Sequence, residues 1–208
     1  MTDPRNVHLI ATKHILRYLR GTVDYGLKYK NDERINLEGY VDSDWAGSAV
    51  DRKSTLGFCF SMGSGVISWF SRKQSCMALS TAEVEYVTSC SASCEAVWLK
   101  KILSNLFDLQ LDATCIHYDN QSCMKLSENL VFHDKSKHIE IKYHYIRDMV
   151  HRGVVKLQYV AMEEHIADVL MKPLARMKFE CFKERLGVLQ IEASFQEKVM
   201  RPIAILTW

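Results

Sequence analysis

The sequence predicts an α/β fold in which helices flank a mixed β-sheet. Three strand patterns follow one another at 35–41, 55–63 and 65–73, and glycines between the last two predict a hairpin. A long helical pattern at 80–107 then precedes another strand pattern at 114–120. Strands joined by short turns pair antiparallel, whereas a strand reached through a helix crossing can pair in parallel. This order therefore indicates a mixed sheet with helices on its faces.

The first elements along the chain are predicted to be a helix and a short strand. Residues 7–20 carry apolar side chains at helical spacing, and Gly21 follows as a stop signal. The stretch "YGLKYK" at 25–30 then predicts a short strand. The next stretch, "INLEGYV", alternates apolar and polar residues, which predicts a strand ending near Asp42, with Asp44 in the loop beyond it.

The long helix is predicted to begin at a capping signal and to present a carboxylate to the sheet. Ser80 or Thr81, with an acid downstream, resembles a capping box. Glu85 shares its helical face with small residues, so this face can lie close to the sheet and direct Glu85 toward the strand ends. Glu83 lies about 200° away around the helix, so the two glutamates cannot serve one site.

The second half of the chain alternates predicted helices and strands. In order, we predict a strand within 114–120 that ends on Asp119, helices at 121–129 and 136–153, a strand at 154–160, a helix at 164–174 interrupted by Pro173, and a helix at 178–187. The last residues, 191–208, show no pattern that predicts an element.

Composition places the chain among intracellular globular proteins. Apolar residues make up 48% of the 208 residues, and 27 basic against 25 acidic residues give a net charge of +2, which neither requires nor excludes a polyanionic partner. The chain begins without a secretory signal, and no apolar run approaches the roughly 18 residues that a membrane helix needs. The seven cysteines form no C-x-x-C pair, which favours reduced thiols over a zinc site.

Four acids are predicted to gather at the ends of these elements: Asp42, Glu85, Asp119 and Asp168. Like charges close together raise one another's pKa, and a divalent cation removes that penalty. Mg²⁺ prefers oxygen ligands, and two such ions about 4 Å apart can stabilise both oxygens of a phosphoryl displacement. As an alternative, Asp119 and Asp168 only cap helices.

Basic and amide side chains nearby are candidate contacts to nucleic acid. Arg52 with Lys53, and Arg72 with Lys73, are expected at opposite ends of the hairpin, where they could contact phosphates. The alternative is an ordinary solvated surface. Asn120 either touches the nucleic acid or caps the helix that follows it.

Several motifs occur together and in a fixed order: "ILRYLRGTVDYGLKY", "GYVDSDWAGSAVDRKSTLGFCF", "ISWFSRKQ", "ALSTAEVEY", "EAVWLKKIL", "YDNQSCMKL", "FHDKSKHIEIKYHYIRD" and "IADVLMKPL". Through them the chain resembles the ribonuclease H (RNase H) domain at the C-terminal end of the Pol polyprotein of Ty1/copia-type retrotransposons. The resemblance covers roughly residues 8–188. It implies an RNase H-like fold, with a five-stranded mixed sheet, three antiparallel strands followed by parallel ones, flanked by helices.

The resemblance also implies an activity, a metal and a partner. The activity is endonucleolytic hydrolysis of the RNA strand of RNA–DNA hybrids by two Mg²⁺ ions, or Mn²⁺, held by Asp42, Glu85, Asp119 and Asp168. The implied partners are the hybrid and a reverse transcriptase domain, with no membrane and no small-molecule cofactor. The implied location is the cytoplasm, in a virus-like particle, or the nucleus.

The same resemblance divides the chain and exposes departures from the family. Residues 1–34 match a connection from the reverse transcriptase, residues 35–188 the RNase H-like domain, and residues 189–208 form a tail of unknown structure. Leu130 and Met171 replace the Pro and Thr that are usual in the family, and the Thr common near Met162 is missing. This drift motivates an alternative, a catalytically decayed domain that binds nucleic acid or protein. His165 is expected on the surface of its helix.

Overall fold

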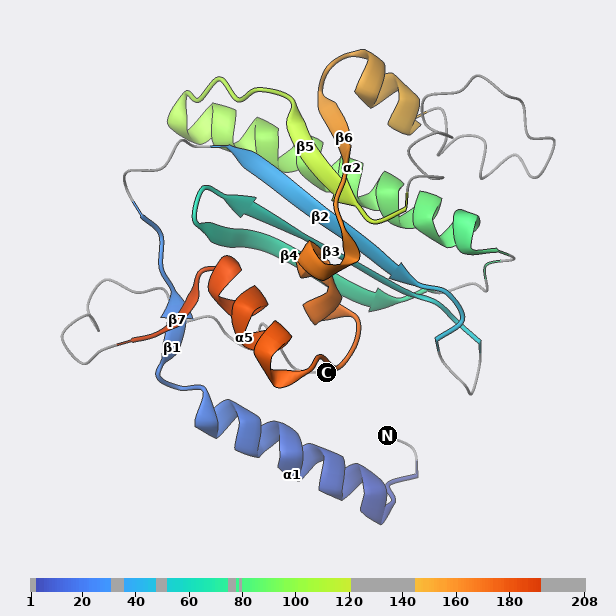
Figure 1. The fold of residues 1–208 in the computed structure, drawn as a ribbon, viewed down its shortest axis with the longest axis vertical. Helices are drawn as coiled ribbons and strands as arrows, with labels where there is room; N and C mark the ends of the chain where they lie inside the picture. Colours follow the sequence, from blue (N-terminus) through green and yellow to red (C-terminus); the bar gives the residue numbers. More distant parts are fainter. Residues whose placement is uncertain are drawn as a thin grey trace.

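A five-stranded mixed sheet lies at the centre of the computed structural model (Figure 1), which describes residues 3–30, 36–47, 52–74, 78, 80–120 and 145–191. Its strands lie in the order β4–β3–β2–β5–β6. Their bounds are Leu37–Asp44 for β2, Thr55–Met62 for β3, Gly65–Lys73 for β4, Thr114–Tyr118 for β5 and Val155–Tyr159 for β6.

The pairing of these strands confirms the predicted mixed sheet. β2, β3 and β4 pair antiparallel, with Asp42 opposite Gly57 in β3. β5 then pairs in parallel with β2 on its other side, and β6 pairs in parallel with β5. The carboxyl ends of β2, β5 and β6 consequently lie at one edge of the sheet. β2 continues to Asp44, so the prediction that Asp44 lies in a loop beyond the strand was wrong.

One face of the sheet is covered by the long helix α2 (Thr81–Phe107). Its side chains Ala92, Ala96, Leu99 and Leu103 are buried in one core with alternate residues of the strands, including Val41 and Phe60. Small residues on this helix face allow a close approach, as the sequence predicted. Ser80 caps the helix by accepting a hydrogen bond from the Glu83 backbone N–H at 3.2 Å.

The opposite face is covered by two 3₁₀ helices and α5 (Arg176–Arg185). A second core unites Phe182 of α5 with Tyr40 and Cys59, which alternate in the strands with residues of the first core. The two layers thus sandwich the sheet (Figure 1). Lys183 lies over the Tyr25 ring, 4.6 Å from its centroid, and so links α5 to the smaller sheet described below.

The chain enters this domain through α1 (Asn6–Gly21) and a small second sheet. The predicted helix α1 is confirmed. It buries none of its residues, and its apolar side chains Val7 and Leu16 are 63% and 60% exposed. β1 (Tyr25–Leu27) pairs antiparallel with β7 (Val188–Gln190). β7 was not predicted, and its first residues lie at the expected boundary between domain and tail. Figure 1 shows α1 apart from the central layers, beside this small sheet.

The segment expected to be a helix at 164–174 instead forms two 3₁₀ helices, η1 (Met162–Glu164) and η2 (Ile166–Leu170). Four of the five residues of η2 are buried, so the segment lacks the solvent-facing side of an amphipathic α-helix. His165 has extended backbone between the two turns, which interrupts any continuous helix.

Of two other predicted helices, one is described in part and the other lies outside the described residues. Residues 145–151 are helical, in agreement with the end of the helix expected at 136–153. The helix expected at 121–129 and residues 136–144 lie outside the described residues. Among the residues that the structure describes, no helix is long and apolar enough to cross a membrane.

Candidate metal centre

Three of the four predicted acids line one small pocket at the carboxyl ends of β2 and β5. Asp42 reaches it from β2, Asp119 from the residue after β5, and Glu85 from the second turn of α2. The pocket has a volume of about 240 Å³ and also contains Asn120 and Met162 in its wall. Parallel strands place their carboxyl ends at one edge of a sheet, which is why residues far apart in sequence meet here.

Asp42, near the end of β2, is held by a backbone hydrogen bond and has a raised pKa. The Ser43 backbone N–H donates a 2.8 Å hydrogen bond to Asp42 Oδ1. Burial, followed by the negative charges of Asp119 and Asp168, raises the pKa of Asp42 to about 7, while Lys172 lowers it. A cation at this position would remove the repulsion that holds the proton on.

Glu85 is positioned by both its helix and a neighbouring loop. Thr88 and Ser89, one turn further along α2, are buried, which brings this face of the helix against the sheet. The side-chain amide of Asn120 donates a 2.6 Å hydrogen bond to Glu85 Oε1. Burial raises the pKa of Glu85, and the hydrogen bond from Asn120 opposes this shift. Asn120, predicted to contact nucleic acid or cap a helix, therefore supports a carboxylate.

Asp168 and the nearby His165 both lie beside Asp42. Asp42, His165 and Asp168 each offer one potential ligand atom, and these atoms lie within 4.8 Å of one another. The expectation that His165 is a surface residue was wrong, because its side chain is fully buried at 0% exposure. His165 has extended backbone between η1 and η2, and its ring lies edge-on to that of Tyr40, with 6.2 Å between ring centroids.

Neither ring nitrogen of His165 makes a hydrogen bond of ordinary geometry within the described part of the chain. Burial lowers the pKa of His165, and the charges of Asp119 and Asp168 oppose this shift. The imidazole is therefore neutral near pH 7, the form that can donate a lone pair to a metal ion.

Asp168 is fully buried but already has two cationic partners. Lys172 Nζ lies 2.7 Å from Asp168 Oδ1, and Lys178 Nζ lies 2.8 Å from Oδ2. Burial alone would raise the pKa of Asp168, but these two ammonium groups outweigh it and hold the pKa below its usual value. Neither lysine was predicted from the sequence, although the i, i+4 spacing of Asp168 and Lys172 was a usable signal.

The donor set fits a divalent cation. Three carboxylates facing one pocket supply the oxygen ligands that Mg²⁺ and Mn²⁺ favour, and the fourth carboxylate lies beside Asp42. Asp44, by contrast, is exposed and packs its carboxylate against the turn at Gly47, away from the pocket lining. Of the first two acids in the sequence, Asp42 is thus the one that faces the candidate site.

The four basic residues proposed to contact nucleic acid lie together. The expectation of opposite ends was wrong: Thr55 pairs with Lys73 and Leu56 with Arg72, so both basic pairs flank the open end of the β3–β4 hairpin. In a hairpin the first strand begins beside the end of the second, so residues just before β3 must lie near the last residues of β4. Because Asp44 pairs with Thr55, the basic end is also the end of the sheet that carries Asp42.

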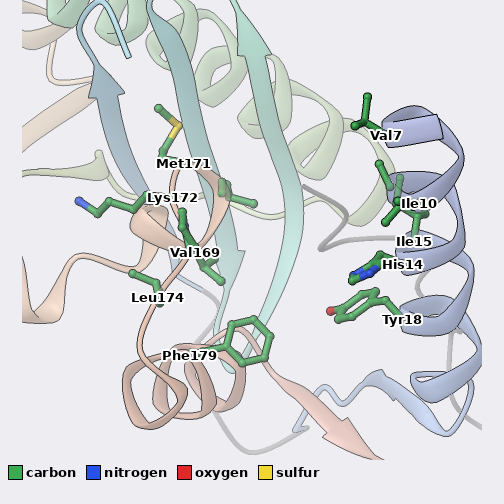
Figure 2. A pocket seen from close by; sticks show the side chains of 13 residues that line it. Val7, Ile10, His14, Ile15, Tyr18, Val169, Met171, Lys172, Leu174 and Phe179 are labelled. Carbon is green, nitrogen blue, oxygen red and sulfur yellow. The ribbon is translucent and has the colours of Figure 1, made fainter. Parts of the chain in front are cut away.

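A larger cavity, of about 750 Å³, lies away from the acids. Apolar side chains of α1, including Val7, Ile10 and Tyr18, face the segment 169–174 and Phe179 across it (Figure 2). None of the four acids lines this cavity. We therefore place the candidate chemistry in the smaller pocket, which Asp42, Glu85 and Asp119 line.

The fold and the acidic pocket define an RNase H-like α/β domain: a five-stranded mixed sheet, three strands antiparallel and two parallel, covered by helices on both faces. No protein-family model matches the chain. The chain is 40% identical to the retrovirus-related Pol polyprotein from transposon TNT 1-94 of Nicotiana tabacum. The alignment spans 188 residues, or 90% of this chain. The chain is also 37% identical to the retrovirus-related Pol polyprotein from transposon RE2 of Arabidopsis thaliana, over 194 residues or 93% of this chain.

The chain belongs to the Pol polyproteins of copia-type retrotransposons, as their RNase H-like region. It spans only 14% and 13% of the length of the two relatives just named. A similar solved structure is RNase H1 from the archaeon Halobacterium salinarum, 16% identical, with a TM-score of 0.47 over 65% of this chain and 93% of that one.

Proposed function

We propose that this domain is an endoribonuclease that hydrolyses the RNA strand of RNA–DNA hybrids with the help of two divalent cations. The observation that carries the proposal is the meeting of Asp42, Glu85 and Asp119 in one pocket, with Asp168 beside Asp42, in a chain from a Pol polyprotein. Acids this close are costly to ionise together, and cation binding is the direct way to offset that cost.

In the proposed mechanism, the four carboxylates would hold the cations, and neighbouring side chains would orient the carboxylates. Divalent cations, when bound, lower the pKa of water and neutralise charge that develops on the scissile phosphate. Asp42 would lose its proton when it holds a cation, and the hydrogen bond from Asn120 would keep the Glu85 carboxylate turned into the pocket. Arg52, Lys53, Arg72 and Lys73, proposed phosphate contacts, lie at the same end of the sheet and would guide the hybrid backbone toward the acids.

Cleavage of a labelled RNA–DNA hybrid with Mg²⁺ tests the proposal. The wild type should cleave the RNA strand, and Asp119→Asn should lose at least about a hundredfold in rate, because it removes a ligand charge from the pocket. Asp44→Asn is the matched control, since it removes a carboxylate at the same edge of the sheet, from the end of β2, outside the pocket lining. Folded wild type without activity would overturn the function, and an active Asp119→Asn would overturn the site.

One observation favours a second function, binding of the hybrid without hydrolysis. Asp168 is already neutralised by two lysines, as expected if a cation no longer needs to bind there. A domain of this kind would bind the hybrid in a salt-dependent manner and show no turnover. The cleavage assay above, paired with a binding assay on the same hybrid, separates the two functions.

A further inference from the structure

The two lysines that contact Asp168 are held in different ways. Lys178, on α5, also donates a 3.1 Å hydrogen bond to the Met162 backbone carbonyl and lies 5.1 Å from the centroid of the Phe182 ring. These contacts tie its ammonium group to the fold. The side chain of Lys172 is 47% exposed and follows the end of η2. In Figure 2 its nitrogen points away from the apolar side chains of α1.

Lys172 also interacts electrostatically with two further acids, Asp42 and Asp119. Burial lowers the pKa of Lys172, but the hydrogen bond to Asp168 and the charges of Asp42 and Asp119 outweigh it and raise this pKa. In turn, Lys172 lowers the pKa of both Asp42 and His165. Its ammonium group therefore interacts with the three residues whose potential ligand atoms lie within 4.8 Å of one another.

We propose that Lys172 is a tethered counter-ion that occupies the cation position formed by Asp42, His165 and Asp168, and that a divalent cation binding there displaces its ammonium group. The inference rests on the cation site of the proposed function and adds its regulation. An ammonium group and a divalent cation a few Å apart repel each other strongly in a partly buried site. Lys172 consequently weakens cation binding, while it stabilises the metal-free domain by neutralising Asp168.

Chemical labelling of lysines in the wild-type chain tests the displacement without any substitution. The full chain is acetylated briefly with and without Mg²⁺, and the modified lysines are quantified by mass spectrometry. Lys172 should become at least about threefold more reactive when Mg²⁺ is added, because its ammonium group leaves Asp168. Lys178 contacts the same carboxylate and serves as the internal control, whose reactivity should stay constant.

Cation affinity in variants provides the second measurement, with Mn²⁺ binding followed by electron paramagnetic resonance. Lys172→Met should bind Mn²⁺ about tenfold more tightly than the wild type, since the competing charge is gone. Lys172→Arg keeps the charge and should stay within about twofold of the wild type. Lys178→Met removes an ammonium from the same carboxylate but from outside the proposed cation position, so its affinity should change less than that of Lys172→Met.

The outcomes separate this inference from the proposed function. Unchanged labelling of Lys172 on addition of Mg²⁺ would overturn the inference, as would equal or weaker Mn²⁺ binding by Lys172→Met. A wild type that cleaves hybrids while Lys172 stays in place would leave the proposed function standing without this regulation. Displacement of Lys172 in a chain that cleaves no hybrid would support the inference and overturn the nuclease.

Discussion

The side-chain amide of Asn120 donates a 2.6 Å hydrogen bond to Glu85 Oε1, which ties the end of β5 to the second turn of α2. Both residues line the acidic pocket, and they are 35 positions apart in the chain. This hydrogen bond favours the ionised form of Glu85 against its burial. It therefore orients the carboxylate and opposes the effect of burial on its pKa.

Removing this hydrogen bond should weaken cation binding without unfolding the domain. A hydrogen bond to a charged group is worth about 1.5 kcal/mol, so Asn120→Ala should bind Mn²⁺ roughly tenfold more weakly. Isothermal titration measures the affinity, and circular dichroism checks the fold. Asn120→Gln keeps an amide donor and serves as the comparison. Equal affinities for wild type and Asn120→Ala would show that Glu85 is held by its helix alone.

The raised pKa of Asp42, about 7, makes the stability of the metal-free domain depend on pH. Since the folded-state pKa lies above the ordinary value of 3.8, protonated Asp42 adds stability below about pH 4, and this contribution is lost as pH rises through about 7. The Tm of the wild type, measured relative to Asp42→Asn, should therefore fall between pH 5 and pH 8. Saturating Mg²⁺ should abolish the fall, whereas a Tm difference that is constant with pH would contradict the prediction.

Close packing at Gly39 should make β2 intolerant of a larger residue. A Cβ at Gly39 would lie 2.5 Å from Cε1 of the fully buried Phe60 ring on the neighbouring strand. Gly39→Ala should thus cost about 1–3 kcal/mol of unfolding free energy in urea denaturation. Gly21→Ala is the control, because nothing lies within 4 Å of a Cβ there, at the end of α1. Combining Gly39→Ala with Phe60→Leu should recover part of the loss.

The described cysteines should differ sharply in reactivity. Burial raises the pKa of the Cys59 thiol to about 12, and its side chain is only 2% exposed. Cys94 and Cys181 are exposed. A thiol reagent such as Ellman's reagent should label Cys94 and Cys181 in the native chain within minutes and leave Cys59 unmodified until the protein is denatured. Early labelling of Cys59 would mean that the layer containing α5 opens readily.

The basic end of the hairpin should contribute to the salt dependence of hybrid binding. Removing one cationic side chain that binds a phosphate should lower the slope of log K against log salt by about 0.9, so Arg72→Ala should reduce it by about that amount. Lys156→Ala removes one charge from the exposed surface of β6, at the other edge of the sheet, and is the matched control. Fluorescence anisotropy at several salt concentrations measures both slopes, and identical slopes for the two variants would argue against the basic end as a contact surface.

Periodicity in the sequence was sufficient to predict the sheet and its main helix. Alternation marked β2, and glycines marked the β3–β4 hairpin. The small residues following Glu85 correctly indicated which face of α2 lies against the sheet. These features are local, because one strand or one helix carries its own burial pattern. β7 has only three residues and pairs with a strand more than 160 positions away, so no local pattern could reveal it.

The sequence by itself determined the α/β order, the RNase H-like family and the four candidate acids, because each is written in local spacing or in motifs. Only the tertiary structure decided that His165 is buried beside Asp42 and that two lysines neutralise Asp168. The physical reason is that charge and burial depend on groups brought together from distant segments. Lys178 reaches Asp168 from the next helix, and its partner could be identified only once the chain had folded.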